Sequence, residues 1–181
     1  LLVQDTTLST KLVMKIANEK LSELDNQEWQ KDIFNDKANE INGNKLRTYR
    51  LYKNNVSVEP YVRQNLTSSQ RRLMAMFRAG SLPLALETGR YSRPPVPVQN
   101  RLCQFCSLSE VETEKHFLMT CDLYSDLRFE IFYEASKHIA NFQNISMDEK
   151  FIEIMNCDTI QQLLCKQLHK FFTRRKLYLD I

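Results

Sequence analysis

The sequence contains the run Arg101-Leu-Cys-Gln-Phe-Cys106, followed shortly by Glu114-Lys-His-Phe-Leu-Met-Thr-Cys121. These runs hold four residues of metal-binding type with the spacing C-x2-C-x9-H-x4-C, namely Cys103, Cys106, His116 and Cys121. Two cysteines separated by two residues can wrap one metal ion in a single turn, and the His and Cys can supply the other corners of a tetrahedron. Thiolate and imidazole ligands suit Zn²⁺, and four protein ligands leave no open position for water. The pattern therefore predicts one structural Zn²⁺ ion.

Free cysteines can also be simply small, buried hydrophobic residues. Four residues of ligand type within nineteen positions, with a short polar segment at 107–115 between them, favour the metal site instead. The other two cysteines, Cys157 and Cys165, lie in stretches of apolar periodicity and are predicted to be core residues. The cysteine count of five is odd and no secretory signal precedes them, so we expect no disulfide framework.

The composition is that of a globular protein, with 181 residues, 43% hydrophobic and 26% charged. Only three glycines occur, which excludes glycine-rich phosphate loops. No stretch approaches the length of a transmembrane helix, so we expect no membrane partner and an intracellular protein of the nucleus and cytoplasm. The chain begins with Leu1-Leu2 and no Met, which favours an excerpt from a longer polypeptide.

The charge is distributed unevenly along the chain. The segment from Lys45 to Arg101 contains eleven Lys or Arg residues and two acids, whereas residues 1–44 and 102–181 are each net acidic. An Arg-rich segment of this kind is typical of a phosphate-binding surface, although many basic stretches are only solvated helix faces. The predicted nucleic-acid contacts are Lys45, Arg47, Arg50, Arg71, Arg72, Arg78, Arg90, Tyr91, Arg93 and Arg101.

The hydrophobic periodicity predicts a mainly α fold, a helical domain with an embedded Cys-Cys-His-Cys zinc-binding segment. Residues 1–44 are expected to form an acidic helical hairpin, with helices at 8–24 and 27–41 separated by Asp25-Asn26. Residues 45–101 form a basic helical segment with a Pro-rich arm, and residues 102–123 form the zinc-binding segment. Residues 124–181 form C-terminal helices that pack with the preceding part.

Within these parts, local signals predict individual elements. Pro60 favours the first turn of a short helix at 59–66, and the run Thr67-Ser-Ser-Gln70 offers an N-cap to a basic helix that Gly80 closes. Four of the five prolines fall in residues 81–97, which predicts an extended or irregular segment. Further helices are predicted at 124–139, 147–155 and 159–179, and residues 45–53 are interpreted as helical.

The sequence also resembles a known family. The runs Lys45-Leu-Arg-Thr-Tyr-Arg-Leu-Tyr-Lys53, Arg71-Arg72, Phe77-Arg78 and Leu84-Ala-Leu-Glu-Thr-Gly-Arg-Tyr91 resemble the region downstream of the reverse transcriptase in LINE-type non-LTR retrotransposons. The two cysteine-containing runs, followed by Leu123-Tyr-Ser-Asp-Leu-Arg128, are similar to the zinc-binding segment of those open reading frames. The resemblance extends from Lys45 to the C-terminus.

The resemblance implies a non-catalytic module that binds RNA template or target DNA for a polymerase located elsewhere in the parent polypeptide. The run Tyr124-Ser-Asp-Leu127 lacks the second acid of a polymerase Tyr-x-Asp-Asp motif, and no clustered carboxylates suggest a two-metal nuclease. His138 and His169 lie in helical patterns without an adjacent carboxylate, so neither is expected to be a general base. Expected partners are nucleic acid and other domains of the parent; the alternative is a docking or oligomerisation module from a domesticated retroelement fragment.

Overall fold

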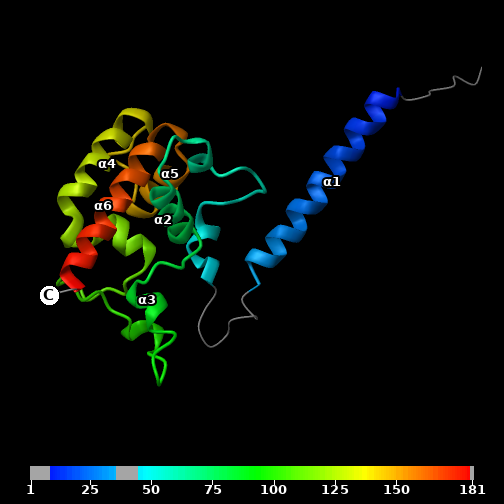
Figure 1. The fold of residues 1–181 in the computed structure, drawn as a ribbon. Helices are drawn as coiled ribbons and strands as arrows, with labels where there is room; N and C mark the ends of the chain where they lie inside the picture. The colour runs from blue at the N-terminus through cyan, green and yellow to red at the C-terminus, as the bar shows by residue number, and fades with distance from the viewer. Residues whose placement is uncertain (1–8, 36–44, 180–181) are drawn as a thin grey trace, which may run out of the picture.

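The computed structural model describes residues 9–35 and 45–179, and most of them are helical (Figure 1). Apart from one isolated antiparallel bridge between Leu102 and Val111, these residues contain no β-structure. The predicted mainly α class is therefore confirmed. The helices are α1 to α6, joined by short 3-10 and π-helical turns labelled η2 to η8.

The N-terminal region is one helix where the sequence predicted two. Helix α1 (Thr10–Ile33) is capped by the Ser9 side chain and continues through Asp25 and Asn26 without a break. Asp and Asn cost a helix at most about 0.7 kcal/mol each relative to Ala, and no Gly or Pro interrupts this stretch. The predicted break, and with it the hairpin, is wrong for this helix; positions 36–41 of the second predicted helix lie outside the described residues.

Only the C-terminal end of α1 contacts the rest of the protein, and the helix projects away from the body in Figure 1. The Asn26 side chain accepts from the Val56 N–H at 2.8 Å, and the Gln30 amide donates to the Asn54 carbonyl at 3.0 Å. The Trp29 ring meets the Tyr49 ring edge-on, with centroids 6.2 Å apart. These contacts form a joint between α1 and the body.

The first part of the body consists of short turns leading into a capped helix. Residues 45–53, interpreted as helical, form two 3-10 turns, η2 (Lys45–Arg47) and η3 (Tyr49–Leu51), and η4 (Pro60–Arg63) begins at its proline as predicted. Thr67 and Gln70 make a reciprocal capping box at the start of α2 (Ser68–Arg78). Gly80 follows with φ +63°, and a Cβ there would lie 2.3 Å from the Lys45 carbonyl oxygen. The predicted cap and stop are confirmed.

The proline-rich arm is mostly irregular, as predicted. It contains the single helical turn α3 (Ala85–Thr88), and the 3-10 turn η5 (Val98–Asn100) leads into the cysteine segment. Residues 101–112 then fold back on themselves, and the π-helical turn η6 (His116–Thr120) and the 3-10 turn η7 (Asp122–Tyr124) precede the C-terminal helices.

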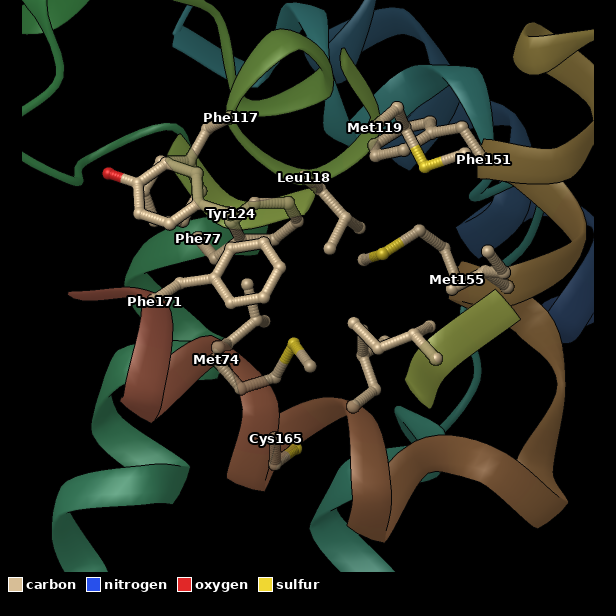
Figure 2. Packing of buried hydrophobic residues seen from close by; sticks show 14 of the residues in the cluster. Met74, Phe77, Phe117, Leu118, Met119, Tyr124, Phe151, Met155, Cys165 and Phe171 are labelled. Carbon is tan, nitrogen blue, oxygen red and sulfur yellow. The ribbon is translucent and has the colours of Figure 1, made fainter. Parts of the chain in front are cut away.

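The C-terminal half closes the core. Its elements are α4 (Ser125–His138), α5 (Met147–Asn156), the turn η8 (Asp158–Ile160) and α6 (Gln161–Leu179), close to the predicted bounds. Helix α6 packs against both α2 and α4. The ring of Phe171 stacks on that of Tyr124, with centroids 4.7 Å apart, and Phe117 meets both rings edge-on (Figure 2). Cys165 is buried in this core as predicted, whereas Cys157 is half-buried.

No helix in the described ranges 9–35 and 45–179 is both long enough and apolar enough to cross a membrane.

Candidate metal centre

The four residues of the cysteine–histidine motif meet in space. Their ligand atoms all lie within 4.8 Å of one another, and three of the four residues are buried. The Sγ atoms of Cys103 and Cys121 are 3.8 Å apart, and the Cys106 Sγ lies 3.4 Å from the His116 Nε2. The predicted group of three cysteines and one histidine is thus confirmed as a set of side chains that can hold one metal ion.

Two local structures bring these ligands together. The backbone folds back over 101–112, where the Cys103 N–H donates to the Glu110 carbonyl at 2.8 Å and the Glu112 N–H donates to the Arg101 carbonyl at 3.0 Å. The π-helical turn η6 then carries His116 inward, and the Cys121 N–H closes the turn on the His116 carbonyl at 2.9 Å. The same turn buries Phe117, Leu118 and Met119 completely or almost so, so ligands and core residues share one element.

A hydrogen-bonding shell orients the histidine. The His116 Nδ1 lies 2.8 Å from a Glu110 carboxylate oxygen and 2.9 Å from the Thr120 hydroxyl. The hydrogen bond to His116 lowers the pKa of the Glu110 carboxyl. Sequence reasoning treated 107–115 only as a polar loop and missed this role of Glu110. Acid–histidine–metal arrangements are a general feature of metal sites and fix which ring nitrogen faces the ion.

The burial of the cysteines determines which charge the site can hold. Burial raises the pKa of the Cys103 and Cys121 thiols, because a thiolate without a nearby cation is poorly solvated there. Cysteine binds metals as the thiolate, and a divalent cation compensates that negative charge. Burial and ligand chemistry therefore both fit a cation at this position.

Two buried arginines attach residues 103–121, here called the metal segment, to the rest of the fold. Arg175 of α6 pairs with both carboxylate oxygens of Glu112, one at 3.0 Å, and also donates to the Pro83 carbonyl at 3.2 Å. Arg128 of α4 donates to the carbonyls of Leu118 (2.8 Å) and Cys121. These arginines are among the least exposed cations of the described structure. The segment is consequently fastened to α4 and α6 as well as to the core.

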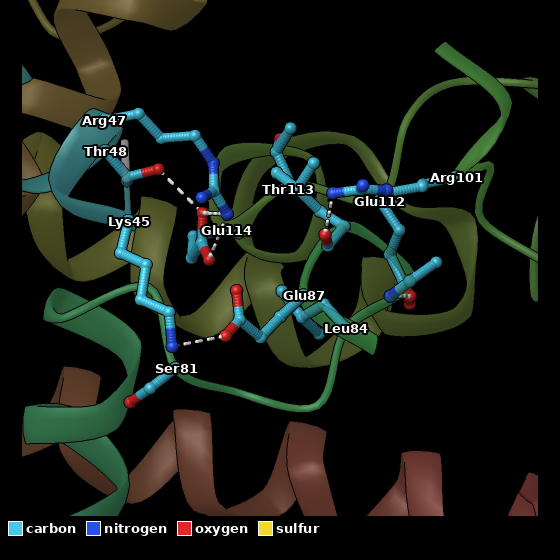
Figure 3. A network of polar contacts seen from close by, with 12 residues as sticks. Lys45, Arg47, Thr48, Ser81, Leu84, Glu87, Arg101, Glu112, Thr113 and Glu114 are labelled. Carbon is cyan, nitrogen blue, oxygen red and sulfur yellow. Dashed lines mark hydrogen bonds and ion pairs between the residues drawn. The ribbon is translucent and has the colours of Figure 1, made fainter. Parts of the chain in front are cut away.

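Much of the predicted nucleic-acid surface is used inside the fold (Figure 3). The Lys45 Nζ lies 2.8 Å from a Glu87 carboxylate oxygen, and this hydrogen bond raises the pKa of Lys45. The Arg47 guanidinium lies 3.2 Å from Glu114, whose other oxygen accepts from the Thr48 hydroxyl at 2.7 Å. These cations neutralise glutamates that are themselves buried.

Three of the predicted contacts are buried and unavailable to a phosphate backbone. Arg78 is 3% exposed and donates to Glu59 at 2.5 Å and to the Met155 carbonyl at 2.6 Å. Arg90 pairs with Glu87 at 2.9 Å, and Arg101 donates to the Val96 and Leu86 carbonyls, each at 2.8 Å. The prediction fails for these residues because the sequence around each arginine does not show which acids and carbonyls the tertiary fold brings against it.

The other predicted contacts differ in their exposure. Arg71 is half-buried and donates to the Val62 and Gln64 carbonyls, and the half-buried Arg50 lies over the Phe34 ring at 5.5 Å. Tyr91 is 68% exposed, although its hydroxyl contacts Lys45 and Glu87. Arg72 and Arg93 are exposed. Few cations of the predicted set are therefore accessible to a phosphate backbone.

The sequence analysis predicted that His138 and His169 have no adjacent carboxylate, and this is wrong for His138. The His138 Nε2 lies 3.1 Å from a Glu134 carboxylate oxygen, one helical turn earlier on α4. This pair is on the surface, and His138 is exposed, so the carboxylate is shared with Lys137 and with solvent. His169 is half-buried on α6.

No protein-family model, curated protein or solved structure matches this chain significantly.

Proposed function

We propose that this protein is a non-catalytic nucleic-acid-binding module stabilised by one structural Zn²⁺ ion. The observation that carries nucleic-acid binding is a cationic surface formed by α2 and α6. The resemblance of residues 45–181 to the C-terminal part of LINE-type open reading frames supports the same proposal from the sequence. In that setting the polymerase lies elsewhere in the parent polypeptide, and other domains of the parent are partners.

The ligand geometry supports zinc as the metal. A tetrahedral ion about 2.3 Å from sulfur and about 2.0 Å from nitrogen gives S–S edges of about 3.8 Å and S–N edges of about 3.5 Å. The Cys103–Cys121 separation of 3.8 Å and the Cys106–His116 separation of 3.4 Å agree with these edges. Four protein ligands complete the coordination of such an ion, which supports a structural role and not a catalytic one.

The cationic surface lies where two helices pack together. Neither α2 nor α6 contains a single Asp or Glu, so their cations are not neutralised within the helices. A groove of about 290 Å³ runs between them, and its polar lining residues are Ser69, Arg72, His169, Thr173 and Lys176. Arg72 and Lys176 are both exposed. We name this the α2–α6 groove.

Two further exposed cations of α6 lie beside the groove. Lys166 lies three residues before His169, and Lys170 lies one turn after Lys166. Lys170 lies 3.9 Å from a Glu130 carboxylate oxygen. A row of cations beside hydroxyl groups suits the sugar–phosphate backbone of RNA or DNA, whose binding is dominated by phosphate contacts.

The test is a pair of substitutions in the groove. The variant Arg72→Ala/Lys176→Ala should bind single-stranded RNA and DNA oligonucleotides at least tenfold more weakly, measured by fluorescence anisotropy. The slope of log affinity against log salt should fall by about 0.7 for each phosphate contact removed. The matched control is Lys31→Ala/Lys137→Ala, which removes two exposed cations outside the groove. Equal affinity of the two variants, or binding of the native chain that salt does not weaken, would contradict the proposal.

A protein-docking function is the second candidate, because α4 exposes an aromatic pair. Phe129 and Tyr133 are 69% and 58% exposed, and their rings stack with centroids 6.2 Å apart. Exposed aromatic side chains are common at protein interfaces. If docking is the function, Phe129→Ser/Tyr133→Ser should abolish binding to another part of the parent polypeptide while leaving affinity for nucleic acid unchanged.

A further inference from the structure

The α2–α6 groove is lined by apolar side chains as well as by cations. Leu73 and Met76 of α2 and Phe172 of α6 are its apolar lining residues. Met76 and Phe172 are half-buried, so part of each side chain remains accessible. Contacts with phosphates are made by charged and polar groups. The accessible apolar surface therefore suits a second chemical group beside the phosphate.

The two walls of the groove have the same pattern. The lining positions extend from Ser69 to Met76 on α2 and from His169 to Lys176 on α6, with the spacing i, i+3, i+4, i+7 on each helix. Side chains at this spacing lie on one face of a helix. Each wall therefore presents an exposed cation and apolar side chains to the same groove.

Several polar groups of the groove are available to a ligand. Among the described residues, the side chains of Arg72 and His169 have no hydrogen-bond or ion-pair partner. His169 is half-buried, and a neutral imidazole offers one donor and one acceptor. The Lys176 Nζ lies 5.2 Å from the centroid of the Phe172 ring. A phosphate held by Lys176 therefore brings the base of the same nucleotide within reach of that ring.

We propose that the α2–α6 groove receives an unpaired base together with its phosphate, so that the protein prefers single-stranded to double-stranded nucleic acid. This inference rests on the nucleic-acid function proposed above and adds the class of nucleic acid. Arg72 and Lys176 hold phosphates, and Phe172 and Met76 contact the face of the base. His169 forms a hydrogen bond with the edge of the base.

The size of the groove favours one base. Its volume of about 290 Å³ is at the lower end of the range for ligand pockets, roughly 300–1,000 Å³. A base in a single strand can turn out of its stack and enter such a groove. In a duplex the bases are paired and stacked, so insertion of one base would require unpairing it.

The first test compares three oligonucleotides of equal length by fluorescence anisotropy with the full, zinc-loaded chain. The probes are a single strand, the duplex of the same sequence, and a single strand whose nucleotides are all abasic. At equal salt, the intact single strand should bind at least fivefold more tightly than the abasic strand, the effect of losing roughly one stacked base. It should also bind more tightly than the duplex, although the duplex has the higher charge density.

The second test changes the side chains that contact the base. Phe172→Leu should reduce the difference in affinity between intact and abasic strands and leave the salt slope unchanged, because the cations remain. The matched control is Phe132→Leu, a half-buried phenylalanine of α4 outside the groove. His169→Ala should weaken binding of the intact strand alone. Zinc content and near-ultraviolet circular dichroism establish that each variant is folded.

The outcomes separate this inference from the proposed function. Equal affinity for intact and abasic strands, or for single strand and duplex, would overturn base insertion and leave phosphate binding in place. An undiminished preference for the intact strand in both folded groove variants, Phe172→Leu and His169→Ala, would also overturn it. Failure of all three probes to bind the native chain would overturn both proposals.

Discussion

The metal segment and α1 are held in place by opposite kinds of interaction. Residues 103–121 depend on contacts with distant parts of the chain, including a buried ion pair to α6 and the aromatic core. Helix α1 depends on its own backbone hydrogen bonds and on a joint at one end. From this contrast we expect that disrupting the metal segment unfolds the body, whereas disrupting α1 leaves the body folded.

The largest effect is expected from removing two metal ligands. Cys103→Ser/Cys106→Ser should abolish Zn²⁺ binding and unfold the body, because structural zinc contributes about 10–16 kcal/mol in small zinc domains. That is as large as the whole stability of most domains, which is about 5–15 kcal/mol. Elemental analysis and near-ultraviolet circular dichroism measure both consequences. Cys157→Ser changes a half-buried cysteine outside the motif and should retain one zinc and a folded core.

A smaller effect is expected from the buried ion pair between the metal segment and α6. Glu112→Gln leaves the Arg175 charge buried without its partner, which should lower the free energy of unfolding by about 3–5 kcal/mol. Urea unfolding measures the change. Asp126→Asn removes the partner of the neighbouring Arg174, but this pair is exposed and should contribute less than about 1 kcal/mol. Similar losses of unfolding free energy in the two variants would show that the Glu112–Arg175 pair is not buried as described.

Removing the hydrogen bond between Glu110 and the ligand His116 should have a smaller effect than breaking the Glu112–Arg175 ion pair. Glu110→Gln should weaken zinc affinity by about 10–100-fold, because the His116 ring loses the carboxylate that orients it. Competition with a chromophoric chelator measures the affinity, and at saturating zinc the variant should have native circular dichroism. Glu153→Gln changes an exposed acid away from the site and serves as the control. Unchanged affinity in Glu110→Gln would exclude this role.

The smallest effect on the body is expected from breaking α1. Asn18→Pro should disrupt α1, at a local cost of about 3 kcal/mol, yet leave zinc content and the unfolding midpoint of the body unchanged. Far-ultraviolet circular dichroism should detect the lost helix. Ala75→Pro is the matched change in α2, where the exposed Ala75 lies in a helix packed on α6. It should destabilise the body strongly, and a comparable loss in Asn18→Pro would remove the contrast between the two regions.

Features set by local spacing could be predicted from the sequence. The four ligands lie within nineteen residues, and the cap at Thr67 depends only on Gln70, three positions later. Short-range chemistry of this kind needs no knowledge of the tertiary fold. The break at Asp25-Asn26 was predicted wrongly because both residues are only mildly unfavourable in a helix.

The net charge of a sequence segment predicted the candidate nucleic-acid surface less well than local spacing predicted the metal ligands and the helix cap. The net charge of residues 45–101 does not include Glu114, which lies later in the chain but folds against Arg47. The prediction from net charge also assumed that Arg78 and Arg101 are accessible, although both are buried and donate to carbonyls. The cations of α6 in or beside the α2–α6 groove lie in a segment whose net charge is negative, so a sum of charges over residues 102–181 conceals them. Their arrangement follows only from the packing of α2 on α6.

The joint at Trp29 gives the protein a built-in optical probe. Trp29 is the single tryptophan of the sequence, and it packs half-buried against Tyr49, outside the aromatic core. Fluorescence excited selectively at tryptophan therefore reports the attachment of α1, while the tyrosine bands of the core report the body. A shift in Trp29 emission at low denaturant, ahead of any change in the tyrosine signal, is the result expected for a helix hinged on a more stable body.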